Sequence, residues 1–178
     1  IQMTMEFFVD ILEIDINRIY ASVFKGEKDI PKDTQSIKAL TEIYSRYGIE
    51  ARVGKDQRIQ EYGKEKNWWG LATGGPCGPD CELFFDTGKQ PCSNQCHINC
   101  DCGKYIEIGN NVFMEYLLEN DRYLPLGRHN VDFGGGLIRI AMILQNVDSI
   151  YETDIYKPIF NRIQNISKIQ NIQSQRVI

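Results

Sequence analysis

The chain has 178 residues and a mass of 20.5 kDa, a length at which one globular domain with its own core is expected. It carries 20 Lys+Arg against 24 Asp+Glu, a net charge of −4, which excludes a generally basic nucleic-acid-binding surface. No apolar run approaches the roughly 18 residues of a membrane span and no charged-then-apolar leader opens the chain, so we expect a soluble, cytoplasmic protein without membrane contacts.

The first third of the chain predicts a helix, a strand and a second helix. Apolar residues over Met5–Ile14 are interrupted by acidic ones, as in an amphipathic helix. Segment 18–25 alternates and is rich in β-branched and aromatic residues, which indicates a strand. Asp33 and Thr34 form a good N-cap pair for the next helix. Apolar residues then recur every three or four positions until Gly48, where we expect that helix to end.

The middle of the chain begins with an unusual composition. Residues 66–82 combine two tryptophans with several glycines and two prolines, so we expect a long irregular loop, and such loops are usually functional. Two interpretations stay open: Trp69 lines a small pocket, or both tryptophan rings simply pack under the loop. Strands are expected to follow at about 82–86 and 104–117.

The last part of the chain predicts two further helices. The glycines at 134–136 precede a helix over 137–147, and another helix is expected over 154–166, followed by a polar tail at 167–178 that frays. Because the expected strands have helices before and after them, the predicted fold class is α+β, built around an antiparallel sheet, with residues 1–166 as one domain.

Two charged residues flank the three glycines. Asp132 could bind an amine, and the planar guanidinium of Arg139 could hold a phosphate or a carboxylate. A simpler interpretation also stands, in which the aspartate caps a tight turn and the arginine is solvated. The chain has no G-x-x-x-x-G-K-[ST] loop and no G-x-G-x-x-G after a strand, so those nucleotide-binding folds receive no support.

All six cysteines lie between positions 77 and 102. Four of them, at C-x3-C-x3-C-x-C spacing and with His97 beside one, could close a tetrahedral zinc site, since zinc prefers thiolate and imidazole ligands. This spacing differs from the common C-x2-C knuckles, so free thiols on a surface insertion and incidental disulfides stay open as alternatives. The other two, Cys77 and Cys81, could contribute to such a site only if the fold brings them close to these four. The four candidate ligands are Cys92, Cys96, Cys100 and Cys102.

Five segments, read in order, resemble the second half of the catalytic domain of the alanyl-tRNA synthetases. The resemblance extends over residues 64–160, more than half of the chain, and is weaker over 5–63. An ordered set of five motifs is highly specific. The segments are KNWWG, GGPCGPDCELFFD, YIEIGNNVFMEY, LPLGRHNVDFGGGLIR and YETD.

The resemblance implies a class II synthetase core, an antiparallel sheet flanked by helices, which is incomplete here. It also implies that alanine is activated with ATP and Mg²⁺ and transferred to tRNA(Ala), by positioning and charge neutralisation. Trp69 would line the alanine pocket, Asp132 would pair with the α-ammonium and Gly134 would leave room for the methyl group. The complete set implied is Trp69, Asn110, Asp132 and Gly134 for alanine, with Gly136 and Arg139 for ATP.

The chain departs from the family pattern at several points. Gly109 stands where the family commonly has Trp, Ile138 stands where it has Glu, and no H-x-x-x-H editing signature is present. Motif 1 and the motif 2 arginine that clamps the α-phosphate do not fit before Phe7, so we expect a separate N-terminal catalytic segment to supply them. The alternative hypothesis is a degenerate paralogue that serves as an alanine-binding or zinc-bearing interaction module.

Overall fold

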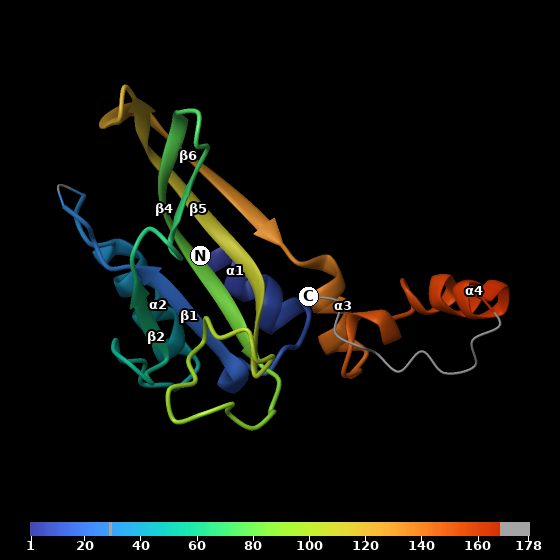
Figure 1. Cartoon of the computed structure of the whole chain (residues 1–178). Helices are drawn as coiled ribbons and strands as arrows, with labels where there is room; N and C mark the ends of the chain where they lie inside the picture. Colours follow the sequence, from blue (N-terminus) through green and yellow to red (C-terminus); the bar gives the residue numbers. More distant parts are fainter. Residues whose placement is uncertain (29, 168–178) are drawn as a thin grey trace. The chain divides into compact units, whose positions relative to one another are not determined.

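The computed structural model describes residues 1–28 and 30–167, which divide into two compact units (Figure 1). The first unit, Ile1–Gly136, contains the sheet and the N-terminal helices, and the second unit begins at Leu137 and is helical. No helix in these described residues is both long enough and apolar enough to cross a membrane.

A six-stranded sheet forms the centre of the first unit. Its main path runs β2-β1-β4-β5-β6, and β3 pairs with β4 beside that path. The β1–β2 pair is parallel and the other pairs are antiparallel, so the expected fold class, a mostly antiparallel sheet with helices, is confirmed. The strands are β1 (Ile19–Phe24), β2 (Ile59–Tyr62), β3 (Trp68–Gly70), β4 (Gly75–Asp86), β5 (Tyr105–Glu119) and β6 (Arg122–Gly135).

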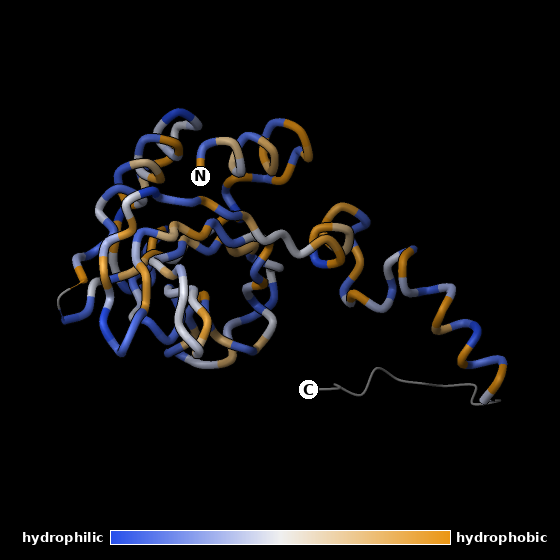
Figure 2. The backbone as a smooth tube through the Cα atoms, turned by 90° about the horizontal axis from the view of Figure 1, so that it is seen from above, coloured by the Kyte–Doolittle hydropathy of each residue, from blue (hydrophilic) through white to orange (hydrophobic). Residues whose placement is uncertain are grey.

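Two helices cover one face of this sheet. Helix α1 (Gln2–Glu6) continues into a π-helical segment, Phe7–Ile11, and α2 (Thr34–Arg46) lies next to it. Figure 2 shows these N-terminal helical turns along one side of the strands. Thr4 of α1 donates a hydrogen bond to Asn111 of β5 (2.7 Å), which identifies the covered face. Since side chains alternate along a strand, Asn110 belongs to the opposite face.

The predictions for the first third of the chain are largely confirmed. The expected strand is β1, and Asp33 caps α2 by accepting a hydrogen bond from the Ser36 amide (2.9 Å). Gly48 follows the helix with a φ of +76°, the conformation that favours glycine at a helix end. The first helix begins earlier than expected, at Gln2. Strand β2 was not predicted.

The loop expected over residues 66–82 is wrong, because most of that segment is strand. It contains β3 and the first eight of the twelve residues of β4. The physical reason lies at Gly78, where an added Cβ would come within 1.9 Å of the Phe113 carbonyl oxygen of β5. The glycine therefore allows a close approach of two backbones, beside an irregular step in the β4–β5 register.

The two long strands β5 and β6 form a hairpin. The strand expected at 104–117 corresponds to β5, whereas β6 was not predicted. Asn120 and Asp121 form the turn with φ values of +50° and +58°, the positive values that a tight two-residue hairpin requires and that Asn and Asp tolerate.

The second unit contains both helices expected near the end of the chain. Helix α3 (Leu137–Leu144) ends three residues before the expected limit, and α4 (Lys157–Ser167) begins three residues after the expected start. Gln145 and Asp154 link the segments through two hydrogen bonds of 2.6 and 2.9 Å. Of the predicted polar tail, residues 168–178 lie outside the described residues.

The contact at Gly78 gives a stability prediction. We expect Gly78→Ala to destabilise the chain by about 3 kcal/mol, because the added methyl group meets backbone that cannot rotate away. Gly127→Ala is the matched control in β6, since nothing lies within 4 Å of its added Cβ. Urea unfolding of both variants measures the difference, and equal midpoints would contradict the proposed contact.

Candidate functional site

A row of aligned residues crosses the sheet on the face opposite α1 and α2. The pairing register places Gln60 beside Ser22, Ser22 beside Glu82, Glu82 beside Asn110, and Asn110 beside Gly134. We call these five residues the polar row. Four of the five strands on the main path contribute polar side chains to it, and β6 contributes a glycine at its end.

A second row lies next to the polar row on the same face. Asp80 of β4 and Asp132 of β6 are both paired with Val112 of β5. Asp132 and Gly134 are two residues apart on β6, so they share a face. The register thus brings together three residues of the predicted alanine site: Asn110, Asp132 and Gly134.

Buried hydrogen bonds connect the two rows. The side-chain amide of Asn67 donates to the Ser22 hydroxyl (2.8 Å) and to the Asp80 carboxylate (3.1 Å). The Ser22 hydroxyl in turn donates to Glu82 (3.2 Å), and the Asn110 amide donates to Asp80 (3.3 Å). Asn67 is 0% exposed and Asp80 is 3% exposed, so the two contacts of Asn67 are buried, whereas the Ser22–Glu82 and Asn110–Asp80 contacts are partly buried.

Sequence reasoning identified Asp132 but not the other two carboxylates of this site, Asp80 and Glu82. Asp80 and Glu82 are two residues apart, the spacing that puts both on one face of a strand. That signal was missed because the segment containing Asp80 was expected to be a loop. Asn67 precedes β3 and carried no pattern of its own.

The site has an excess of hydrogen-bond acceptors. Burial, together with the neighbouring acidic groups, raises the pKa of Asp80 to about 6 and that of Glu82 to about 8. Among the described residues, the side-chain oxygens of Asn67 and Asn110 are buried without a hydrogen-bond donor. Unpartnered acceptor oxygens of this kind are suited to accept hydrogen bonds from an ammonium group.

The other predicted site residues lie outside the two rows of aligned strand residues. Trp69 lies on β3 opposite Gly78, with 39% of its side chain exposed, while Trp68 packs against other aromatic rings. Gly136 ends the first unit, where its amide donates to the Ile108 carbonyl (3.2 Å). Arg139 lies on α3 in the second unit.

The departure at Gly109 faces away from the polar row. Gly109 follows the alternation of Asn111 on the helix-covered face, and an added Cβ would lie 2.9 Å from the Phe133 ring and 3.1 Å from the Phe8 ring. Those two phenyl groups occupy the space into which a larger side chain would extend. A larger side chain at this position would therefore meet the packing beneath α1, on the face opposite the polar row.

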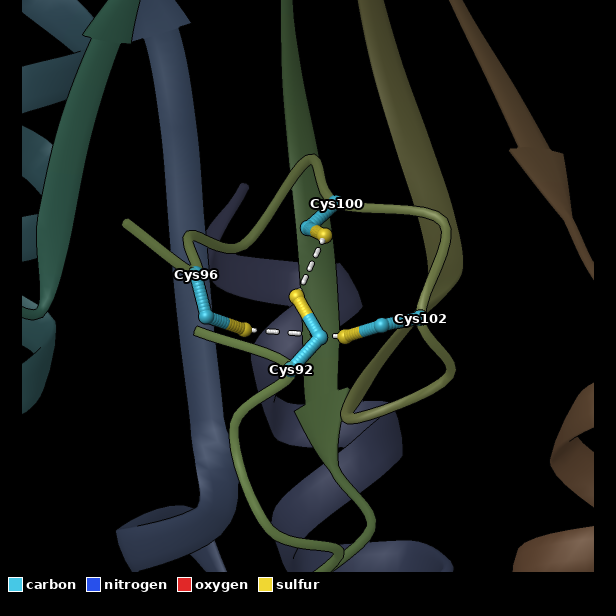
Figure 3. Close-up of side chains that lie close together, drawn as sticks. All are labelled: Cys92, Cys96, Cys100 and Cys102. Atoms are coloured by element: carbon cyan, nitrogen blue, oxygen red, sulfur yellow. Dashed lines mark hydrogen bonds between the residues drawn. The ribbon is translucent and has the colours of Figure 1, made fainter. Parts of the chain in front are cut away.

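The four candidate metal ligands converge in one loop between β4 and β5. Their sulfur atoms all lie within 4.8 Å of one another, and the sulfur atoms of the Cys92–Cys100 and Cys96–Cys102 pairs are 3.5 Å apart. Figure 3 shows the thiols pointing toward one another in front of β4, with helical turns beyond the strand. A hydrogen bond from the Lys104 amide lowers the pKa of the Cys102 thiol to about 7. The cluster has the ligands and the compactness to hold a metal ion.

The two remaining cysteines do not join this cluster. Cys77 and Cys81 are buried in β4, and burial raises the pKa of both thiols. They are inert core residues in a strand.

Comparisons with known proteins agree with these motifs. The family model for tRNA synthetases class II (A) matches residues 1–178. Curated relatives named alanine–tRNA ligase are 47% identical in Borreliella burgdorferi (89% of this chain, 25% of the relative), 45% in Borrelia hermsii (94% and 28%) and 42% in Treponema denticola (96% and 28%). The chain thus spans about a quarter of the length of these relatives.

The raised pKa of Glu82 predicts how stability depends on pH. Between about pH 4.5 and 8 the folded chain retains a proton on Glu82 that the unfolded chain has lost, so stability falls as the pH rises. Between pH 5 and pH 8 the free energy of unfolding of the wild-type chain falls. We expect Glu82→Gln to reduce this fall by on the order of 2 kcal/mol, measured by urea unfolding. Glu119→Gln, at the exposed end of β5, is the control and should leave the slope unchanged. An unchanged slope in Glu82→Gln would overturn the assignment.

Proposed function

The chain belongs to the family of class II tRNA synthetases (A), and from this premise we propose that it is a piece of the catalytic domain of an alanine–tRNA ligase. In the proposed reaction ATP, entering with Mg²⁺, activates alanine, and the alanyl group then passes to tRNA(Ala) in the cytoplasm. Since the chain spans about a quarter of its relatives, the proposal includes a further segment carrying motifs 1 and 2 as a partner.

The excess of acceptors around Asn110 is the observation that supports this proposal most directly. An alanine molecule brings an ammonium group with three donors, which complements the unpartnered Asn110 oxygen and the carboxylate of Asp132. Buried acceptors gain hydrogen bonds when such a ligand arrives. The bound ligand thereby offsets the free-energy cost of burying these acceptors away from water.

The methyl group of alanine has a matching space in the proposal. Gly134 lies opposite Asn110, and nothing lies within 4 Å of the position that a Cβ would take there. A glycine at this register position leaves room for a small apolar group beside the ammonium site. Trp69 is proposed as a wall of the same pocket, for which its partly exposed ring is available.

Gly136 and Arg139 are proposed as ATP-binding residues, and Gly136 directly follows the end of β6 that carries Gly134. Gly136 would allow the nucleotide to approach the backbone, and the guanidinium of Arg139 would hold phosphate oxygens in a bidentate pair. Mg²⁺ accompanies the phosphates and neutralises their charge. The chain's own residues act by orienting the alanine carboxylate toward the α-phosphate, without a covalent enzyme intermediate.

A non-catalytic function is the second candidate. Ile138, which replaces the family glutamate beside the ATP residues, favours an alanine-binding module that has lost activation. Alanine-dependent ATP–pyrophosphate exchange, measured with the segment carrying motifs 1 and 2 present, separates the two functions. A binding module would bind alanine and give no exchange.

The cysteine cluster is proposed as a zinc site. In a regular tetrahedron with zinc–sulfur bonds of about 2.3 Å, the sulfur atoms stand about 3.8 Å apart. The observed sulfur–sulfur separations, from 3.5 Å to at most 4.8 Å, bracket that value. Four thiolates leave no open coordination position, so the role proposed for the metal is structural.

Alanine binding gives the test of the proposed substrate. We expect Asp132→Asn to weaken alanine binding about tenfold to a hundredfold, because a charge-assisted hydrogen bond to the ammonium is lost. Asp121→Asn, at the tip of the same hairpin, is the matched control and should bind normally. Titration calorimetry with alanine, and with lactate as the analogue without an ammonium group, measures both. Equal binding of lactate and alanine would sink the proposal.

Metal content tests the zinc site. We expect about one zinc per chain by elemental analysis, and less than a tenth of that in Cys96→Ser, since removing one of four ligands opens the site. Cys77→Ala removes a thiol outside the cluster and should leave the zinc content unchanged. Zinc-free wild-type protein with four reactive thiols would refute the assignment.

A further inference from the structure

The loop that carries the cysteine cluster is attached to the sheet at three places. At its base the Thr87 amide and hydroxyl both donate to the Lys104 carbonyl (2.8 and 2.9 Å). In its middle Ile98 is 1% exposed, so this side chain is packed into the protein. Next to it, Nδ1 of His97 lies 3.4 Å from the Tyr62 hydroxyl of β2, with the ring centroids 5.9 Å apart.

We propose that His97 and Tyr62 are positioning residues through which the metal-filled cysteine cluster holds the polar row in the arrangement that receives alanine. This inference rests on the zinc site and on the alanine site proposed above. It assigns the metal a function in substrate affinity, in addition to its effect on the loop itself.

The cysteines on either side of His97 would tether it once they bind a metal ion. This residue lies between Cys96 and Cys100, and the Cys100 amide donates a hydrogen bond to the His97 carbonyl (3.0 Å). When both thiolates bind one ion, the backbone between them is fixed at both ends. The imidazole is then held against Tyr62, whereas without metal this short segment depends mainly on the anchor at Ile98.

The Tyr62 hydroxyl connects His97 to Gln60. It donates its proton to the side-chain oxygen of Gln60 (2.7 Å), so its own oxygen can accept from Nδ1 of His97 in the tautomer that carries the ring proton there. A hydroxyl held on both sides has a fixed orientation, and Gln60 is fixed with it. Gln60 is the first member of the polar row.

The polar row continues from Gln60 across the sheet. Gln60 and Ser22 are neighbours on the parallel β2–β1 pair, and both side chains are buried. Ser22 then contacts Glu82 and Asn67, Asn67 contacts Asp80, and Asp80 holds the amide of Asn110. Polar neighbours therefore extend from the cysteine loop to Asn110. A network of this kind couples two sites when it has alternative arrangements that both sites favour differently.

Side-chain amide resonances in nuclear magnetic resonance spectra test the inference without relying on activity. Zinc removal with a chelator is expected to shift the amide signals of Gln60, Asn67 and Asn110 in the wild-type chain. In Tyr62→Phe, which keeps the ring and removes the hydroxyl, zinc should still bind and those signals should no longer respond. Tyr123→Phe, on β6, is the matched control and should respond as wild type. The exposed amide of Asn130 should stay unchanged throughout.

Alanine affinity gives the second measurement. We expect chelation to raise the alanine Kd by roughly threefold to tenfold in the wild type and to leave it unchanged in Tyr62→Phe. Zinc that binds stoichiometrically without moving the three amide signals overturns the inference and leaves the zinc site standing. A response that persists in Tyr62→Phe also overturns it, and absence of bound zinc overturns both. If alanine fails to bind while the amide signals respond, the proposed substrate is wrong and the coupling holds.

Discussion

Strand β4 has to be hydrogen-bonded along both edges, and the rest of the first unit depends on this requirement. One edge pairs with β3 and then with β1, while the other edge pairs with β5 over nearly its whole length. A strand enclosed in this way cannot contain bulky residues wherever a neighbouring backbone crosses closely. Its glycines and prolines are therefore compatible with a central position, although the same residues are typical of loops in most sequences.

The central position of β4 in the sheet also explains why its two acidic side chains are largely removed from solvent. Asp80 and Glu82 are carried into the interior because the residues between and beside them, such as Cys81 and Leu83, pack beneath the helices. Strict alternation then forces the carboxylates together on the opposite face. The resulting site is costly for the folded state and preorganised for a positively charged ligand, a compromise common at binding sites.

The amino-acid sequence predicts most of the helices, the long strand β5 and three site residues that the register indeed aligns. Helices α2 and α3 have strong periodicity, and the cap at Asp33 is a local signal. Strands β2 and β6 were missed because their pairing partners are distant in sequence or because Pro125 and Gly127 weaken the local pattern. Asp80 could not be recognised without the β4–β5 register, which is a property of the tertiary structure. The spacing of the four cysteines allowed a shared metal site but left free thiols and disulfides open, and only the fold of the loop shows that their sulfur atoms converge.

The two edges of the sheet differ greatly in length. At one edge β2 has four residues, and His97 of the cysteine loop lies against it. At the other edge β6 has fourteen residues, with Val131 71% exposed, and in the described part of the chain no strand pairs with its outer side. An open edge of this length is a template for an incoming strand, and only Pro125 and the charged residues along β6 oppose such pairing. Among the described strands, β6 is therefore the edge at which an added strand, from this chain or another, would find the longest unpaired backbone.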